Sequence, residues 1–142
     1  MICLDTSILT PLILPESASE RVAASFHSLP PDDLAVSQWT VIEFASLVAR
    51  KVRMGDLDAE GAARADAQLD TLLERSVAIL LPDLGDYVAA RRYLRRFESG
   101  LRAPDALHLA IASNRGVTAF YTLDKKLIAA ANLFGLPVAE GI

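Results

Sequence analysis

The stretch Met1-Ile2-Cys3-Leu4-Asp5-Thr6-Ser7 introduces the pattern that recurs along this sequence, a short apolar run followed directly by polar residues. The apolar run is typical of a buried strand, and Asp, Thr and Ser favour the start of a helix, here before an apolar turn at residues 8–14. Further strands are expected at residues 34–36, 77–81, 118–122 and 137–139, and helices at residues 16–29, 38–53, 58–75, 86–97, 106–114 and 124–134. This alternation predicts an α/β three-layer sandwich, with a mostly parallel sheet of about five strands and helices on both faces.

The 142 residues suffice for one hydrophobic core, and no repeat, linker or low-complexity tract divides them, so a single domain over residues 1–142 is expected. Apolar residues make up 52% and charged residues 23%, which favours a folded chain over a disordered one. The mean hydropathy of +0.31 indicates either an apolar surface that meets a partner or an alanine-rich helical protein. The formal net charge of −4 disfavours bulk electrostatic binding of nucleic acid and leaves a local basic patch open.

Cys3 is the single cysteine, which excludes an internal disulfide, and its place in an apolar run predicts a buried side chain. A reducing, cytoplasmic compartment is consistent with this. The sequence has no basic segment or cleavage site typical of a secretion signal. Its longest strongly apolar stretch, residues 8–14, contains Pro11 and is too short to cross a bilayer, so no membrane association is expected.

Three aspartates stand where strands end or helices begin. Asp5 ends the first expected strand, Asp124 comes two residues after Thr122, and Asp105 follows Pro104 at a helix start. In open α/β sheets the carboxyl ends of the strands border the ligand crevice, so Asp5 and Asp124 are expected at the same edge. Each aspartate taken alone is better explained as a helix N-cap, which contributes about 0.5–2 kcal/mol relative to alanine.

Glu43 is different, because it lies inside the otherwise apolar stretch Val41-Ile42-Glu43-Phe44-Ala45-Ser46-Leu47-Val48-Ala49 of an expected helix. Helix capping does not explain a glutamate there, and no cation stands three or four residues away to form a helical ion pair. An unpaired carboxylate is very costly to bury, so Glu43 must either face water or have a specific partner. The apolar surroundings favour a partner.

Considered together, Asp5, Glu43, Asp105 and Asp124 predict a site for a divalent cation. Two carboxylates about 4 Å apart repel each other by roughly 4 kcal/mol at an effective dielectric of about 20, so a shared pocket would protonate them unless a cation lay between them. A ligand set of oxygens without a His/Cys cluster favours Mg²⁺ or Mn²⁺. Such an ion activates a water molecule and stabilises charge on a phosphodiester.

Four segments carry a family resemblance in their order and spacing: Leu4-Asp5-Thr6-Ser7, Val41-Ile42-Glu43-Phe44, Ala103-Pro104-Asp105-Ala106-Leu107-His108-Leu109-Ala110 and Thr122-Leu123-Asp124. Together they resemble PIN-domain proteins of the VapC toxin type. The resemblance implies a PIN-like fold and an Mg²⁺- or Mn²⁺-dependent endoribonuclease, with the four acids as catalytic and metal-binding residues and Ser7 and Thr122 as supporting hydroxyls. It also implies a VapB-type antitoxin that holds the toxin inactive, and a homodimer.

Basic residues near the acids are candidates for contact with an RNA backbone, because phosphate binding uses Arg and Lys. A run of charges is more often a solvated helix face. The position of each basic residue relative to the acids therefore decides between RNA contact and a solvated face. The candidates by position are Arg50, Lys125 and Lys126. His108 lies one helical turn after Asp105, where a core position or a supporting role behind the ligands is favoured over ligation.

Two other functions fit parts of the pattern. A catalytically inactive PIN-like interaction protein would use the acids as structural caps. A phosphate-handling domain of receiver or phosphatase type is disfavoured, since Asp5-Thr6-Ser7 lacks a second aspartate two residues on and no glycine-rich phosphate loop is present.

Overall fold

The computed structural model describes residues 1–140 and contains a five-stranded sheet in the order β3-β2-β1-β4-β5. All pairings between neighbouring strands of this sheet are parallel. The strands are β1 (Ile2–Leu4), β2 (Leu34–Ser37), β3 (Ala78–Leu80), β4 (Ala119–Tyr121) and β5 (Val138–Ala139). The predicted α/β fold with a mostly parallel sheet is confirmed, and β1 lies at the centre of the sheet.

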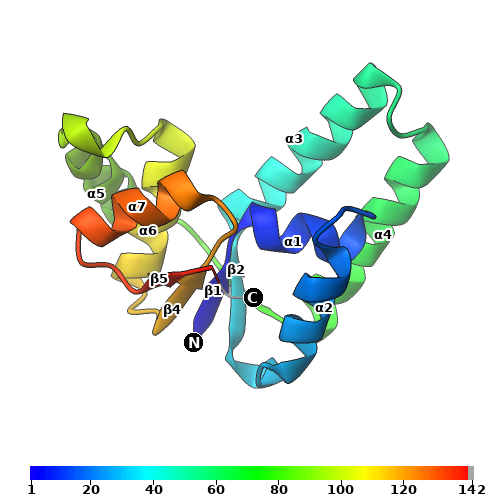
Figure 1. Ribbon diagram of the computed structural model, residues 1–142, viewed down its shortest axis with the longest axis horizontal. Coiled ribbons are helices and arrows are strands. Elements are labelled where there is room, and N and C mark those ends of the chain that lie inside the picture. The colour runs from blue at the N-terminus through cyan, green and yellow to red at the C-terminus, as the bar shows by residue number, and fades with distance from the viewer. Residues whose placement is uncertain (141–142) are drawn as a thin grey trace.

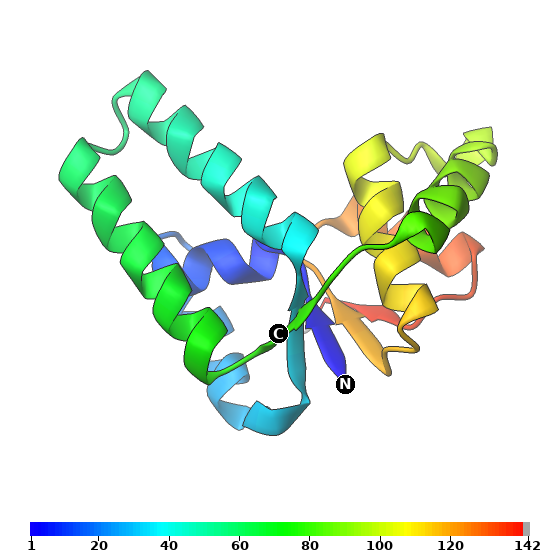
Figure 2. The same cartoon turned by 180° about the vertical axis from the view of Figure 1, so that it is seen from behind.

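Helices cover both faces of the sheet (Figures 1 and 2). One face carries α1 (Thr6–Ile13), α2 (Ser19–Ser28), α3 (Gln38–Met54) and α4 (Ala59–Arg75). The other carries α5 (Leu84–Leu94), α6 (Ala103–Asn114) and α7 (Lys125–Leu133), and short 3-10 turns lie at Pro31–Asp33 and Phe97–Ser99. The hairpin of α3 and α4 extends away from α5–α7, which gives the V shape seen in Figure 1. Within residues 1–140, no helix combines the length and apolar character needed to cross a membrane.

The alternating side chains of β1 divide the core into two layers, because successive residues of a strand point to opposite faces. Cys3 belongs to the cluster that contains Phe120 and the buried face of α6, whereas Leu4 packs with Ile8 and Val22 on the α1–α2 side. Burial, reinforced by the negative charge of Asp5, raises the pKa of the Cys3 thiol to about 12. Cys3 is therefore a neutral, buried side chain, as predicted from its apolar surroundings.

The structure differs from the sequence-based expectation mainly where helices start. The expected helix start at residues 5–7 opens a full helix, α1, over residues 6–13 and not only an apolar turn, although Pro11 lies inside it and has no backbone N–H to donate. Helix α5 begins at Leu84, two residues earlier than expected, because the Asp83 side chain caps it. Helix α6 begins at Ala103, three residues earlier than expected, and this places Asp105 in its first turn.

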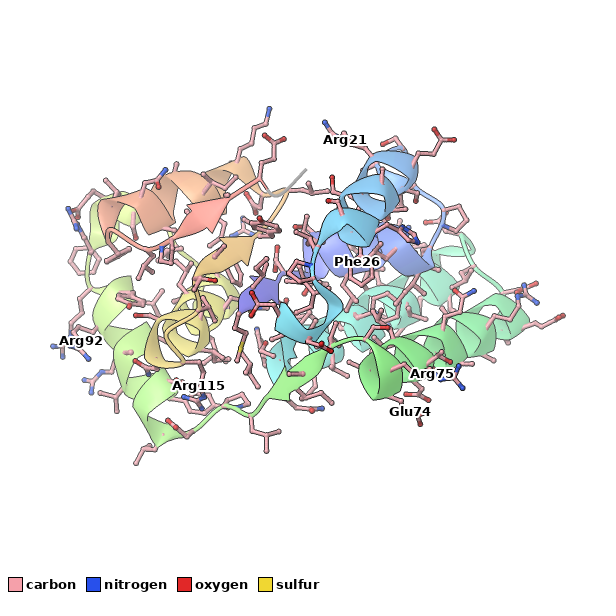
Figure 3. All side chains as sticks on the ribbon, turned by 90° about the horizontal axis from the view of Figure 1, so that it is seen from below. Arg21, Phe26, Glu74, Arg75, Arg92 and Arg115 are labelled. Carbon is pink, nitrogen blue, oxygen red and sulfur yellow. The ribbon has the colours of Figure 1, made fainter. Side chains whose placement is uncertain are left out.

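A buried ionic cluster joins the start of α5 to the end of α6. The Asp86 side chain is 0% exposed, and its carboxylate accepts hydrogen bonds from the Asp83 backbone N–H at 2.8 Å and from Asn114 Nδ2 at 2.7 Å. Arg115, labelled in Figure 3, places its guanidinium 3.2 Å from Asp86 Oδ2 and also donates to the carbonyl oxygen of Leu81. Because a buried charge is tolerated only when it is paired, these contacts make Asp86 a structural element of the α5–α6 layer.

Candidate active site

The four acidic residues selected from the sequence line one cavity of about 530 Å³. Asp5 directly follows β1, and Glu43 lies in the second turn of α3, which begins directly after β2. Asp105 occupies the first turn of α6, and Asp124 is the N-cap of α7. The cavity thus lies where parallel strands end and helices begin, the usual ligand-binding edge of an open α/β sheet.

Asp5 is held by hydroxyl groups and does not cap the helix that follows it. Its side chain is 8% exposed, and although Asp5 occupies the N-cap position of α1, it makes no capping hydrogen bond. Instead, Asp5 Oδ2 accepts hydrogen bonds from Ser7 Oγ and from Thr122 Oγ1, both at 2.7 Å. Ser7 Oγ also accepts the backbone N–H of Leu123 at 2.8 Å. Ser7 and Thr122, predicted as supporting residues, therefore orient Asp5 directly.

Glu43 has two specific partners, as its apolar surroundings in the sequence favoured. Glu43 Oε2 accepts a hydrogen bond from Thr6 Oγ1 at 2.6 Å and lies 2.5 Å from His108 Nε2. His108 Nε2 is also 3.6 Å from Asp5 Oδ1, and the His108 side chain is 3% exposed. Sequence reasoning overlooked Thr6, which it regarded only as a helix-starting residue. It expected His108 at a core position or in a supporting role behind the ligands, and the buried imidazole contacts Glu43.

Asp105 and Asp124 each bond a helix N-terminus through one carboxylate oxygen. Asp124 Oδ1 accepts the backbone N–H groups of Lys126 and Leu127 at 2.8 and 3.2 Å, and Asp105 Oδ2 accepts that of Arg102 at 3.3 Å. Within residues 1–140, no hydrogen bond reaches the other oxygen of either carboxylate. Capping and metal binding are therefore compatible roles for these two residues.

The pKa shifts in this cavity follow from burial and from its crowded negative charge. The pKa of Asp105 is raised, first by burial and then by repulsion from Asp124 and Asp5. Burial alone would also raise the pKa of Glu43, but hydrogen bonds from His108 and Thr6 and the His108 charge outweigh it, so this pKa is lowered. For His108 burial favours the neutral ring, yet the hydrogen bond to Glu43 and the surrounding carboxylates raise its pKa.

The donor set fits a divalent metal ion. Asp5, Glu43 and His108 each offer one ligand atom, and these atoms lie within 4.8 Å of one another. Carboxylate oxygens suit Mg²⁺ or Mn²⁺, and the His108 Nε2 that holds Glu43 by a hydrogen bond cannot bind an ion at the same time. Asp105 and Asp124 lie outside this tightest group but line the same cavity. A bound cation would also relieve the repulsion that raises the pKa of Asp105.

The predicted basic residues occupy different places around the acids. Arg50 lines the acidic cavity itself. Lys126 lines a second cavity that adjoins it, whereas Lys125 is exposed and lines neither of these two cavities.

Comparison with known proteins places the chain in a family. The PIN domain family model matches residues 2–133. Among solved structures, the fold is similar to VapC20 of Mycobacterium tuberculosis, described as a toxin that cleaves the sarcin-ricin loop, with a TM-score of 0.75, 21% identity and coverage of 92% of this chain and 95% of that one. It is also similar to FitAcB of Neisseria gonorrhoeae, with a TM-score of 0.73, 23% identity and coverage of 99% and 98%.

A third similar structure is VapBC2 of Rickettsia felis bound to a DNA fragment from its promoter, with a TM-score of 0.65, 16% identity and coverage of 98% of each chain. A search of curated protein sequences gave no match. At these identities the solved structures establish a shared fold, and the family match spans nearly the whole chain. The chain belongs to the PIN-domain family.

Proposed function

We propose that this protein is a metal-dependent endoribonuclease that acts as the toxin of a toxin–antitoxin pair. The observation that carries the proposal is the convergence of Asp5, Glu43, Asp105 and Asp124 on one cavity. Membership of the PIN-domain family supports nuclease chemistry, and the similar fold of VapC20, described as a toxin that cleaves the sarcin-ricin loop, supports RNA as the substrate.

Rigid placement of the ligands is the contribution of this chain to the reaction. The Ser7 and Thr122 hydroxyls hold Asp5, and Thr6 and His108 hold Glu43, so the carboxylates need little reorganisation when substrate arrives. A divalent ion, when bound, supplies activation of a water molecule and stabilisation of charge on the phosphodiester. Arg50 lines the same cavity and would bind substrate phosphate, while Lys125 and Lys126 lie at the start of α7.

Removal of divalent ions is expected to abolish RNA cleavage. The ion contributes several kcal/mol to transition-state stabilisation, so chelation should lower the rate by about 100-fold or more, and added Mg²⁺ or Mn²⁺ should restore it. Cleavage of a labelled RNA on a denaturing gel, before and after chelation, measures the effect. Cleavage that continues unchanged after chelation would contradict the proposal.

Thermal unfolding provides the control for that experiment. Saturating Mn²⁺ should raise the Tm of the wild-type protein, because a ligand that binds the folded state stabilises it by about 2.7 kcal/mol at 100 times its Kd. The Mn²⁺-induced shift should disappear in Glu43→Gln, which keeps the size of the side chain and removes its charge. No shift in the wild-type protein would favour the alternative function, a catalytically inactive PIN-like interaction protein.

An antitoxin partner of VapB type is part of the proposal. Its support is the family resemblance and the similar fold of VapBC2, which is described as bound to DNA from its own promoter. Expression of the protein alone should arrest growth, and co-expression of a short neighbouring reading frame should relieve the arrest by forming a complex that copurifies. Growth arrest that no neighbouring product relieves would count against this partner.

A homodimer is also proposed, and α5 offers a surface for it. Leu84, Tyr87 and Val88 stand at helical spacing on α5 and are 79%, 55% and 56% exposed. They form an apolar stripe whose contact with water is unfavourable. Light scattering should give about twice the chain mass of 15.3 kDa for the wild-type protein and the chain mass itself for Leu84→Glu/Val88→Glu. The matched control is Met54→Glu at the far end of α3, since Met54 is 67% exposed and outside the stripe. A monomeric wild-type protein would contradict the dimer.

A further inference from the structure

A second, smaller cavity adjoins the acidic one. It has a volume of about 250 Å³ and shares Asp105, Asp124 and Leu127 with the larger cavity. The rest of its lining includes residues 99–102, which connect the 3-10 turn at Phe97–Ser99 to α6, and Lys126 on α7. The two cavities therefore meet along a rim formed by Asp105 and Asp124.

The two cavities differ in their balance of charge. The larger one is lined by five carboxylates and by Arg50, whereas the smaller one has Arg102 and Lys126 beside the two carboxylates of the shared rim. Among residues 1–140, neither the Arg102 nor the Lys126 side chain forms an ion pair. Only their backbone N–H groups are engaged, with Asp105 and Asp124. Two exposed cations are thus available at the smaller cavity.

An RNA strand that is cut internally continues on both sides of the scissile bond and carries a negative charge at every phosphate. The larger cavity alone would repel the flanking phosphates, because a bound divalent ion offsets only part of its negative charge. Phosphate contacts by Arg and Lys supply most of the affinity for a nucleic-acid backbone. Arg50 provides one such contact on α3, and Arg102 and Lys126 are placed to provide others beyond the Asp105–Asp124 rim.

We propose that the smaller cavity is a subsite for the phosphodiester that neighbours the scissile one, with Arg102 and Lys126 as its binding residues. The inference rests on the proposed ribonuclease function and defines the path of the RNA strand across the protein surface. The strand runs from Arg50, over the acidic cavity, to the turn that precedes α6. Since phosphate contacts position a strand without reading its bases, this subsite accepts any nucleotide and leaves sequence preference to other contacts.

The test is steady-state cleavage of an RNA oligonucleotide by Arg102→Ala, Lys126→Ala and the double variant. Each single variant should raise KM about fivefold and the double variant more than about tenfold, with kcat within about twofold of the wild-type value. The salt dependence of KM should weaken as well, because each lost phosphate contact lowers the slope by about 0.7 for a single strand. The charge-matched control is Arg92→Ala, whose side chain lies at the outer edge of α5 in Figure 3 and should leave KM unchanged.

A small phosphodiester, bis(p-nitrophenyl) phosphate, separates the subsite from damage to the active site, because it has no neighbouring phosphate. The double variant should hydrolyse it at the wild-type rate, and an equal loss on both substrates would overturn the subsite. Unchanged KM for RNA in the double variant would overturn it too, while leaving the ribonuclease function standing. Loss of antitoxin binding with unchanged KM for RNA would assign the cavity to a protein partner. Failure of the wild-type protein to cut RNA would instead refute the proposed function.

Discussion

Asp5→Asn is expected to abolish RNA cleavage while leaving the protein folded. Outer partners of metal ligands typically account for about 10- to 100-fold in activity, so loss of a directly ligating carboxylate should cost more than about 100-fold. The amide cannot replace the carboxylate in either orientation. If its NH₂ group takes the place of Oδ2, the Ser7 and Thr122 hydroxyls lose their acceptor, and if it takes the place of Oδ1, the metal side loses an oxygen.

Gel assays with saturating Mn²⁺ measure this effect, and circular dichroism checks the fold of the variant. The matched control is Asp70→Asn, which neutralises an exposed aspartate on α4 and should cut RNA at the wild-type rate. In cells, Asp5→Asn should also remove the growth arrest caused by the wild-type protein. Retained cleavage in Asp5→Asn would exclude the acidic cavity as the catalytic site.

Asp86→Ala is expected to produce the largest loss of stability, about 2–4 kcal/mol in the free energy of unfolding. The substitution removes a fully buried carboxylate, leaves the Asp83 backbone N–H without its acceptor and deprives Arg115 of its buried partner. It also opens the reciprocal capping arrangement at the start of α5. Arg115 can still reach Asp83 and Leu81, which keeps the cost below that of an isolated buried charge.

Urea unfolding followed by circular dichroism measures the change in the free energy of unfolding. The control is Glu60→Ala, which breaks the exposed ion pair between Glu60 and Arg64 and should cost less than about 1 kcal/mol. A loss below about 1 kcal/mol in Asp86→Ala would mean that the cluster is not a stability element. Because Asp86 lies outside the acidic cavity, RNA cleavage below the unfolding transition should remain near the wild-type rate.

The acidic residues could be selected from the sequence because each occupies a position with a known structural meaning. Asp5 and Asp124 follow strands of a parallel sheet, and the topology brings such positions to one edge. Glu43 was informative because a lone carboxylate in an apolar helix is very costly to bury without a specific partner. What the sequence could not supply was the partner itself, since Thr6 and His108 reach Glu43 across 37 and 65 residues.

Two aspartates at equivalent N-cap positions show where sequence reasoning ends. Asp124 does cap its helix, whereas Asp5 makes no capping bond and turns to Ser7 and Thr122. Local sequence favours a cap in both cases, and only the packing of β1 against β4 decides between them. Helix α1 continues through Pro11, which disfavours a helix interior, and the burial of Ile8 and Leu9 in the core holds it there.

The pairing of β1 with β4 also sets when the site comes into being. Thr122 Oγ1 donates to Asp5 Oδ2 across 117 residues, so Asp5 is translated well before its partner. At about 5–20 residues per second, Asp5 waits on the order of ten seconds for that partner to leave the ribosome. A nascent chain that has not yet reached Ala119 contains neither β4 nor Asp124. The acidic site therefore cannot assemble before the segment that contains β4, Thr122 and Asp124 has been translated.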